Sequence, residues 1–405
     1  MPTEKLYYQD AYLREFTAQV LSKTALADGK FAVVLDRTAF YPEGGGQPCD
    51  LGTLNQAPVI DVRTVNEEIV HTTAGDPGEG QLTGRIDWQR RFDHMQQHSG
   101  EHILSGILLA HYQAENVGFH LSPASCQIDV TLPSLTAEQA SAIEDAANAA
   151  IFFNLPVEGR FVEQDELAAY RLRKEPGKEF EQIRLVSVEN CDCCPCGGTH
   201  VARTGEVGLL KIRSWEKRKQ NIRLDFVCGG RALADYRLKH DLARALSSRF
   251  STPVEGTLAA VERTLEKLDA SQSLLAVSRK AYHEELTARL LAEAAGQTAA
   301  GLPVVSRSFI NYSAADLQDF AARITAAGGI CLVAASDSES GRTSLLFASA
   351  AAPPLPMNEL LKQTLAPFGG KGGGNTLSAQ GGLQGGDAET ILSAARVLLE
   401  LNKQG

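Results

Sequence analysis

Two short segments, far apart in the chain, each carry a pair of residues suited to the same kind of metal ion. The first, "HMQQHSGEHILS", holds His94, His98 and His102 at intervals of four, and the second, "CGGTH", holds Cys196 and His200 at the same interval. Residues four apart on a helix lie on one face, so two of the histidines could reach one ion. Three imidazoles and a thiolate form a tetrahedral set that suits zinc. Because Cys196 lies 94 positions after His102, the fold must bring a helix and a distant turn together.

Two other ligand sets stay open from the residues alone. His94 could pair with His98, but as the first helical residue beside its cap it would point away from a site deeper along the helix. A rival C-x-C site would use the crowded cysteines Cys191, Cys193, Cys194 and Cys196. That segment is too short to complete a four-ligand cage without strain unless other ligands contribute. We therefore favour His98 and His102 with Cys196 and His200.

Length and composition narrow the class of protein. A chain of 405 residues is too long for one ordinary core and predicts two to four domains. With 43% hydrophobic and 22% charged residues, it has the composition of a soluble globular protein. No run approaches the roughly 18 to 20 apolar residues of a membrane helix, and "MPTEKLYYQD" lacks the features of a signal peptide. We expect a cytoplasmic protein without a membrane partner, whose eight cysteines are thiols or metal ligands.

The charge distribution predicts a local nucleic-acid surface. A formal net charge of −10 argues against a protein that coats nucleic acid by bulk attraction. Residues 203–223, however, contain seven basic and two acidic side chains, so a polyanion could dock there. The basic residues that we single out are Arg213, Lys217, Arg218 and Lys219.

The first half of the sequence predicts an α+β arrangement. Residues 1–88 carry short β-branched and aromatic runs broken by Gly, Pro and Asp-Gly, which is typical of a small antiparallel β-barrel or sandwich. Residues 89–235 mix helices with strands. Asp93 with Gln96 forms a capping-box pattern that predicts a helix from His94 to about Tyr112. A second such pattern, Thr136 with Gln139, predicts an alanine-rich helix that ends near Asn154.

The second half predicts two further domains. Residues 236–298 carry leucines at a/d spacing, which indicates a helical linker or coiled coil that joins domains or pairs two copies. Residues 299–405 alternate strands and helices, with helices expected from Ser313, over Met357–Leu365 and from Asp387. Between the last two helices lies "FGGKGGGNTLSAQGGLQGG". We expect so much glycine to form neither helix nor strand and to leave backbone N–H groups free for a ligand.

Four motifs together resemble one known family. "FYPEGGGQPCDLG", "HSGEHIL", "CGGTHV" followed by "RTGEVG", and "GGKGGGNTLSAQGG" are similar to motifs of the freestanding alanyl-tRNA editing proteins of the long AlaX type. The resemblance covers nearly the whole chain in the family's order. It implies an α+β multidomain fold with an N-terminal β-barrel domain (1–88), a zinc-binding editing domain (89–235), a helical linker (236–298) and a C-terminal DHH-associated domain (299–405).

The resemblance also implies a function. The family hydrolyses tRNA(Ala) charged with a wrong amino acid, chiefly serine and in some members glycine. Alanine's binding pocket discriminates poorly against these two residues, so a second hydrolytic site is needed. No synthetase core for adenylate formation is recognisable, so we expect a deacylase that edits tRNA without charging it. A homodimer through the helical segment or the C-terminal domain is a further expectation.

The family's site residues carry over position by position. His98, His102, Cys196 and His200 match its zinc ligands. Ser99, Asn116 and His120 lie where relatives line the amino-acid pocket, and Ser99 is placed to bond the serine hydroxyl. Glu101 departs from the small or hydroxyl residue common there, and we expect it to face solvent. The residues expected to contact substrate or tRNA are Gly44, Gly45, Gly46, Gln47, Arg213, Lys217, Arg218, Lys219, Lys371, Gly372, Gly373 and Gly374.

Three other classes of protein remain as alternatives. His98 to His102 also spells H-x-x-E-H, the pattern of a zinc peptidase with Glu101 as general base. A zinc-containing RNA-binding protein without catalysis would suit the basic run and the glycine-rich segment. A DHH-type phosphoesterase is disfavoured, because "FDHMQQ" has Asp-His without the second histidine.

Overall fold

The computed structural model describes the chain except for residues 1–2, 177–181, 297, 300, 354 and 402–405. Contacts divide the chain into two compact units, residues 1–249 and 250–405. Each unit contains both helices and sheets, as the α+β class requires. Among the helices of the described residues, none has both the length and the apolar character that a membrane crossing needs.

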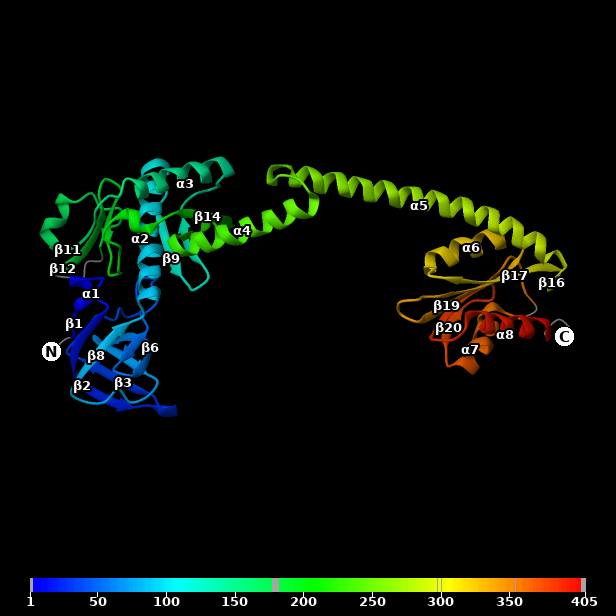
Figure 1. Ribbon diagram of the computed structural model, residues 1–405, viewed down its shortest axis with the longest axis horizontal. Coiled ribbons are helices and arrows are strands. Elements are labelled where there is room, and N and C mark those ends of the chain that lie inside the picture. The colour runs from blue at the N-terminus through cyan, green and yellow to red at the C-terminus, as the bar shows by residue number, and fades with distance from the viewer. Residues whose placement is uncertain (1–2, 177–181, 297, 300, 354, 402–405) are drawn as a thin grey trace. The chain divides into compact units, whose positions relative to one another are not determined.

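The first unit begins with a closed antiparallel sheet (Figure 1). Its strands are β2 (Glu15–Ala25), β3 (Phe31–Leu35), β5 (Gly52–Leu54), β6 (Ala57–Val65), β7 (Glu68–Thr73) and β8 (Gln81–Ile86). β2 pairs with β3 on one side and β8 on the other, so the order β2-β3-β7-β6-β5-β8 closes into a barrel. Alternating residues such as Val33 and Leu35 fill its core. Short segments flank it, namely β1 (Glu4–Lys5), α1 (Leu6–Gln9) and β4 (Arg37–Thr38).

The histidine-bearing helix α2 (Trp88–Tyr112) follows the last barrel strand directly. Its N-cap is Asp87, whose carboxylate accepts a hydrogen bond from the Arg90 N–H at 3.1 Å. The predicted start at Asp93 is therefore wrong by about two turns. Asp93 instead binds Arg231, with Nε–Oδ1 and Nη2–Oδ2 distances of 2.8 and 2.7 Å. The N-cap of α2 is hard to recognise in the sequence, because Asp87 directly follows strand β8 and no loop residues separate the strand from the helix.

A buried ion pair ties α2 to the barrel. The Arg91 guanidinium binds both carboxylate oxygens of Asp50, and neither side chain is exposed by more than 1%. Arg91 also donates to the carbonyls of Ala11 and Ala39, and Asp50 accepts from the Tyr41 N–H. All these partners belong to the barrel side, so Arg91 holds the first turns of α2 in one position.

Two smaller sheets complete the first unit. One has the order β14-β15-β10-β9 and the other β11-β12-β13. Their strands are β9 (Asn116–Leu121), β10 (Cys126–Val130), β11 (Val157–Glu163), β12 (Gln182–Val188), β13 (Asp192–Pro195), β14 (Leu210–Arg218) and β15 (Asn221–Cys228). Helix α3 (Ala137–Phe152) has the predicted capping box of Thr136 and Gln139. α2, α3 and the four-stranded sheet share one core that includes Ile103, Leu104 and Phe226.

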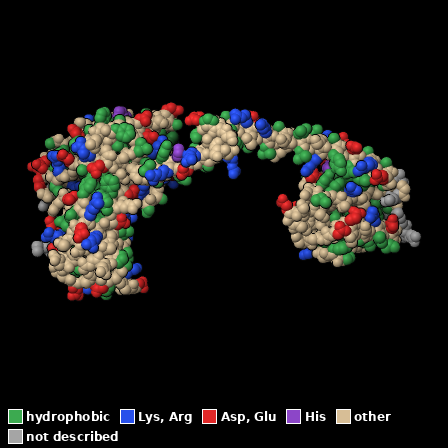
Figure 2. Space-filling view, in the orientation of Figure 1, with side chains coloured by type: hydrophobic (Ala, Val, Ile, Leu, Met, Phe, Trp, Pro, Cys, Tyr) green, Lys and Arg blue, Asp and Glu red, His purple; other side chains and the backbone are tan. Residues whose placement is uncertain are grey.

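Residues 236–298 are largely helical, in agreement with their leucine pattern. α4 (Gly229–Phe250) and α5 (Thr257–Glu293) are separated by a short segment in which Ser251 has a positive φ of 49° and Val254–Gly256 form a 3-10 turn. The a/d residues Leu258, Leu265, Leu268 and Leu275 are exposed. Figure 2 shows hydrophobic side chains interspersed with lysine and arginine along this helical part of the chain.

The second unit is a three-layer α/β structure around a six-stranded sheet. The sheet has the order β16-β17-β18-β19-β21-β20, and β17 and β18 run parallel. Side chains alternate on β18 (Ile330–Ser336), so Leu332 packs against α7 and α8 whereas Val333 packs against α6. The other elements are β16 (Thr298–Ala299), β17 (Leu302–Ile310), α6 (Ala314–Ala326), β19 (Arg342–Ser349), α7 (Met357–Leu365), β20 (Lys371–Gly374), β21 (Ser378–Gln384) and α8 (Ala388–Leu401).

The glycine-rich segment is not a loop, and that prediction was wrong. Lys371 to Gly374 form the edge strand β20, which pairs antiparallel with β21. Glycine is required because α7 lies against this pair: a Cβ on Gly372 would come within 2.7 Å of Leu361 and 2.8 Å of the Gln380 carbonyl. The glycines therefore allow a close helix-to-sheet approach, which a composition-based interpretation cannot distinguish from a flexible loop.

Candidate metal centre

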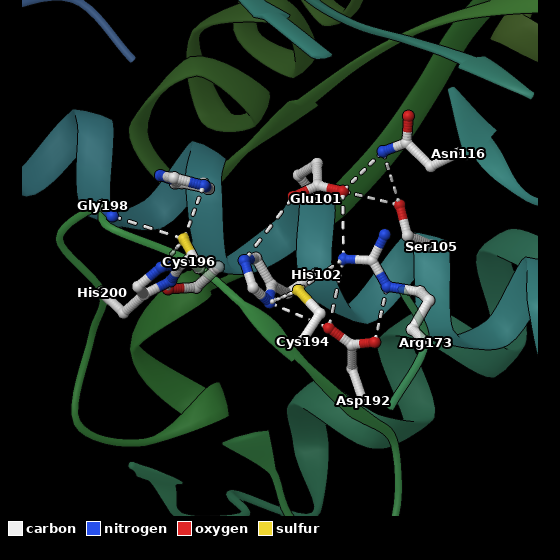
Figure 3. A network of polar contacts seen from close by, with 12 residues as sticks. Glu101, His102, Ser105, Asn116, Arg173, Asp192, Cys194, Cys196, Gly198 and His200 are labelled. Atoms are coloured by element: carbon white, nitrogen blue, oxygen red, sulfur yellow. Dashed lines mark hydrogen bonds and ion pairs between the residues drawn. The ribbon is translucent and has the colours of Figure 1, made fainter. Parts of the chain in front are cut away.

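The four favoured ligands converge, although they come from distant segments (Figure 3). α2 supplies His98 and His102, and the turn after β13 supplies Cys196 and His200. One ligand atom from each lies within 4.8 Å of all the others. The Cys196 Sγ is 3.5 Å from the His98 Nε2 and 3.3 Å from the His200 Nε2. The three histidines are buried, so the group has the donors and the enclosure that a tetrahedral metal site needs.

The turn that carries Cys196 depends on glycine at its centre. A Cβ on Gly198 would lie 2.2 Å from the His98 Cε1 and 2.9 Å from the Gln47 Oε1, so a larger residue could not bring the turn against α2. The Arg184 guanidinium holds the turn from outside, because its Nη1 donates to the carbonyls of Cys196 and Gly198 at 2.8 and 3.0 Å. The "CGGTH" segment thus supplies two ligands, and its glycine lets the turn lie close against α2.

Each histidine has an outer hydrogen-bond partner at Nδ1. His98 meets the Gln47 Oε1 at 2.8 Å, His200 meets the Ser99 Oγ at 3.1 Å, and His102 meets the Asp192 Oδ2 at 2.8 Å. An amide or carboxylate oxygen can only accept, so the protons of His98 and His102 belong on Nδ1 and the Nε2 lone pairs point inward. Outer partners of this kind fix the tautomer and the ring orientation of metal-binding histidines.

Electrostatics favour a thiolate at the centre. Burial alone would raise the pKa of the Cys196 thiol, but the neighbouring histidines, His98 first, hold that pKa well below its usual range. Burial lowers the pKa of His200 to about 3, which keeps its imidazole neutral. A thiolate and a neutral imidazole are the protonation states that bind zinc. Burial would lower the pKa of His102, but the charges of Cys194, Cys196 and Glu101 raise that pKa well above its usual value, so zinc would displace a proton there.

Asp192 is the outer partner that the sequence analysis missed. Asp192 is buried on β13. Besides its contact with His102, its Oδ1 accepts a hydrogen bond from the Arg173 Nε at 2.6 Å. Burial would raise the pKa of Asp192, but its bonds with His102 and Arg173 hold that pKa below its usual range. The only signal in the sequence is its place inside the cysteine cluster.

We expect Asp192→Asn to weaken metal binding by about 10- to 100-fold, since the acceptor for the His102 Nδ1–H loses its charge. Titration of the metal-free protein with zinc against a competing chelator measures this change. Asp225→Asn, which alters another Arg-bound aspartate on β15, is the matched control and should leave zinc affinity unchanged. Equal affinities of Asp192→Asn and the unaltered protein would show that Asp192 does not orient His102.

Glu101 does not face solvent, and that expectation was wrong. Its side chain is 5% exposed, and its Oε1 accepts from the Ser105 Oγ and the Asn116 Nδ2, each at 2.7 Å. Its Oε2 lies 3.8 Å from the His102 Nε2. As Figure 3 shows, the carboxylate is held between Asn116 and the metal centre.

The other predicted pocket residues occupy different places. Asn116 lines the cavity beside the metal centre. Ser99 is fully buried behind His200, where its Oγ accepts from the Val201 N–H at 3.2 Å, so it supports a ligand. His120 is exposed on β9 and lines another cavity with Asp129 and Arg223. The structure thus brings only Asn116 of these three to the cavity at the metal centre.

The "GGGQ" segment forms a tight turn next to the centre. Gly45 and Gly46 have positive φ values of 58° and 85°, as expected for this turn. Gly44 and Gly45 line the cavity, whereas Gly46 packs against β9, where a Cβ would meet the Phe119 carbonyl at 2.6 Å. Gln47 is completely buried, so it orients His98 and does not lie at the surface.

The predicted basic residues lie away from this centre. Arg213, Lys217, Arg218 and Lys219 belong to the β14–β15 hairpin and its turn, and Arg213 and Arg218 form ion pairs with Asp225 and Glu216. In the second unit, Lys371 and Gly372 line a cavity of about 350 Å³ together with Arg342. Gly373 and Gly374 lie on the same exposed edge strand.

Of the two alternative ligand sets, the structure leaves His94 outside any metal group within the part of the chain that it describes, but places one of the clustered cysteines in a second group. His94 is buried, its Nδ1 has no hydrogen-bond partner among the described residues, and burial followed by the charge of Arg90 lowers its pKa to about 3. It lies in the second turn of α2, not at the first position as predicted, and it is outside the metal group. Of the clustered cysteines, Cys194 joins His102 and Asp192 in a second group of ligand-type side chains, which shares His102 with the first.

A cavity of about 540 Å³ opens onto the metal centre. Its wall combines the barrel turn at Gly44, the β9 residues around Asn116, and the segment from Cys194 to Gly198. Lys5 and Lys174 also line it. A polar cavity of this size beside a metal centre can hold a small polar acyl group and the end of a larger anionic molecule.

Known proteins are similar to this chain over most of its length. The family described as "Threonyl and Alanyl tRNA synthetase second additional domain" matches residues 183–225, and "tRNA synthetases class II (A)" matches residues 2–90. The alanyl-tRNA editing protein Aarsd1 of Mus musculus is 36% identical over 64% of this chain and 66% of its own length. An alanine–tRNA ligase of Pyrobaculum aerophilum is 30% identical over 97% of this chain and 44% of its own length.

The alanyl-tRNA editing protein AlaX-L of Pyrococcus horikoshii matches across both chains, with 33% identity over 93% of this chain and 94% of the archaeal protein. The match therefore extends over most of both units. The chain belongs to the family of alanyl-tRNA editing proteins of the AlaX-L type.

Proposed function

We propose that the protein is a trans-editing hydrolase that deacylates mischarged tRNA(Ala), with seryl-tRNA(Ala) as its chief substrate and glycyl-tRNA(Ala) as a secondary one. The observation that carries the proposal is the group of His98, His102, Cys196 and His200 beside a polar cavity, in a chain that matches an editing protein over 93% of its length. Discrimination against serine and glycine by binding alone is weak, which explains why a separate hydrolytic site is needed.

Zinc is the metal that best fits the four donors, because three imidazoles and one thiolate favour a tetrahedral, borderline-soft ion. Bound there, zinc would supply a positive centre that orients the acyl group or the terminal ribose. Four protein ligands fill a tetrahedral shell, so positioning of substrate is favoured over activation of a bound water. The same count argues against the H-x-x-E-H peptidase, whose site keeps one position for water.

The protein's own residues would position the substrate. Gly44 and Gly45 expose backbone to the cavity, so the barrel turn can approach the terminal adenosine closely. Asn116 would act through Glu101, whose carboxylate its amide holds at 2.7 Å, whereas Lys5 and Lys174 suit phosphate oxygens. Ser99, Gln47 and Asp192 would act indirectly, by fixing the ligating imidazoles.

The experiment that tests the function is a deacylation panel with the zinc-loaded protein and tRNA(Ala) charged with serine, glycine or alanine. We expect free serine and glycine to appear and Ala-tRNA(Ala) to be spared. A protein that binds tRNA(Ala) but releases none of these amino acids would support the alternative of a non-catalytic RNA-binding protein.

The tRNA body is proposed to contact the basic hairpin. Arg213 and Arg218 are held by carboxylates, so the exposed Lys217 and Lys219 are the better phosphate ligands. We expect Lys217→Ala and Lys219→Ala each to weaken tRNA(Ala) binding and to reduce the slope of log affinity against log salt by about 1. Lys23→Ala, which changes a carboxylate-paired lysine of the barrel, is the control, and an equal effect there would refute a specific hairpin contact.

The finer domain assignments complete the proposal. Residues 1–88, 89–235, 236–298 and 299–405 act as barrel, editing domain, helical linker and DHH-associated domain. The edge strand with Lys371, Gly372, Gly373 and Gly374 offers a second contact for tRNA, and the exposed leucines of α5 offer a surface for a homodimer. The protein acts on tRNA in the cytoplasm.

A further inference from the structure

Glu101 is a buried carboxylate that three donors surround. The Ser105 hydroxyl and the Asn116 amide bond its Oε1, and the Arg173 Nη2 lies 3.6 Å from the same oxygen. These contacts fix the side chain, so the second oxygen, Oε2, is held 3.8 Å from the His102 Nε2 at the metal centre. Glu101 also lines the 540 Å³ cavity, with its side chain 5% exposed.

Glu101 is a buried negative group in a cavity whose other charged groups are mostly positive. Lys5, Arg173 and Lys174 line the cavity, and a divalent ion with a single thiolate ligand would add a net positive charge. The carboxylates among the lining residues are Glu43 and Glu101. Glu43 is 58% exposed and lies near Arg63, so solvent screens it.

Arg173 forms ion pairs with both Glu101 and Asp192. The Arg173 Nε is 2.6 Å from the Asp192 Oδ1, whereas its closest approach to Glu101 is 3.6 Å. One guanidinium therefore serves two buried carboxylates, with Asp192 as the closer partner. Glu101 is left as the negative group that faces the cavity at the metal centre.

The proposed substrate, an aminoacyl ester, carries a positively charged group that could lie close to Glu101. An aminoacyl ester has its α-ammonium group on the carbon next to the ester carbonyl, so a carbonyl at the metal centre places the ammonium within a few bonds of it. Without a carboxylate, this mostly cationic cavity would repel the ammonium group. A fixed carboxylate oxygen beside the centre converts that repulsion into a charge-assisted hydrogen bond.

We propose that Glu101 is a specificity-determining residue, whose Oε2 accepts a hydrogen bond from the α-ammonium group of the aminoacyl ester. This inference rests on the proposed deacylase function and goes beyond it, because it predicts selection for a free α-amino group. The site then rejects N-blocked acyl-tRNAs, including peptidyl- and formylaminoacyl-tRNAs, whose neutral amide cannot compensate the buried carboxylate.

The test compares Ser-tRNA(Ala) with N-acetyl-Ser-tRNA(Ala), using the zinc-loaded, full-length protein. We expect kcat/KM of the unaltered protein to be at least about tenfold higher for the free amine. Glu101→Gln should lose about tenfold or more on Ser-tRNA(Ala) and change little on the acetylated ester, so that the preference disappears. Glu101→Asp keeps the charge and should recover part of the preference.

Controls separate recognition from a structural role. Ser105→Ala removes a hydrogen bond to Glu101 but leaves its charge, so the preference for the free amine should persist. Zinc content and tryptophan fluorescence check that each variant is folded. An equal loss on both esters in Glu101→Gln would overturn the inference, because a structural or proton-transfer role acts on both.

The rates of the unaltered protein on the two esters also test the inference, even if Glu101→Gln fails to fold. Equal rates on the free and acetylated esters would overturn the inference and leave the deacylase function intact. A protein that deacylates neither ester would overturn the proposed function and the inference with it.

Discussion

Cys196→Ala is expected to abolish stoichiometric zinc binding and to lower deacylation of Ser-tRNA(Ala) by roughly 100-fold or more. Cys196 supplies the single thiolate of the group, and its Sγ lies within 3.5 Å of the Nε2 atoms of both His98 and His200. Without it three imidazoles remain, and the turn that holds His200 against α2 loses its bond through the ion. Elemental analysis of the purified protein and a single-turnover assay measure the two effects.

Cys193→Ala is the matched control for this prediction. Cys193 lies on β13, just before the turn that carries Cys196, but alternation along the strand turns its side chain away from Cys194 and toward the cluster of Val162, Ile183 and Leu185. We expect zinc content and activity to be retained. A metal-free Cys196→Ala protein with full activity, or loss of zinc in Cys193→Ala, would contradict the assigned ligand set.

Arg91→Ala is expected to destabilise the first unit by about 3–5 kcal/mol, because it leaves a buried carboxylate without its cation. Asp50 is 1% exposed and would keep only the Tyr41 N–H as a donor among the contacts described above. The loss would also release α2 from the carbonyls of Ala11 and Ala39. The helix that carries His98 and His102 is therefore tied to the barrel by this pair.

Tryptophan fluorescence during urea unfolding measures the effect on the correct unit, because both tryptophans, Trp88 and Trp215, lie in residues 1–249. Arg85→Ala is the control, since Arg85 and Glu15 form an exposed pair, which is expected to contribute about 0–1 kcal/mol. Similar midpoints for the two variants would show that the buried pair does not hold α2 to the barrel.

The sequence predicted the parts of the fold that depend on local patterns. The capping box at Thr136 and the helix from Ser313 are local signals, and both elements form as expected. The start of α2 was misplaced because Asp87 follows a strand directly, while Asp93 has a cap-like pattern but binds Arg231. The glycines around Gly372 were misjudged because their role depends on α7, which composition does not reveal.

In the candidate site, too, features set by local sequence patterns could be predicted, whereas features set by tertiary packing could not. The ligand pairs could be predicted, because four-residue spacing on a helix and in a turn is visible in the sequence. Their outer partners could not, since Gln47, Arg173 and Asp192 reach the centre only through tertiary packing. Glu101 was expected in solvent because a carboxylate on an amphipathic helix usually is, and the donors that bury it come from α2 itself, β9 and the segment after β11.

X-ray absorption spectroscopy at the zinc edge of the purified protein tests the central claim most directly, since it counts the ligand atoms around the ion. Convergence of α2 with the "CGGTH" turn predicts one sulfur at about 2.3 Å and three nitrogens at about 2.0–2.1 Å. Two or more sulfur ligands would place the ion among the clustered cysteines, and such a spectrum would contradict a centre built from both segments.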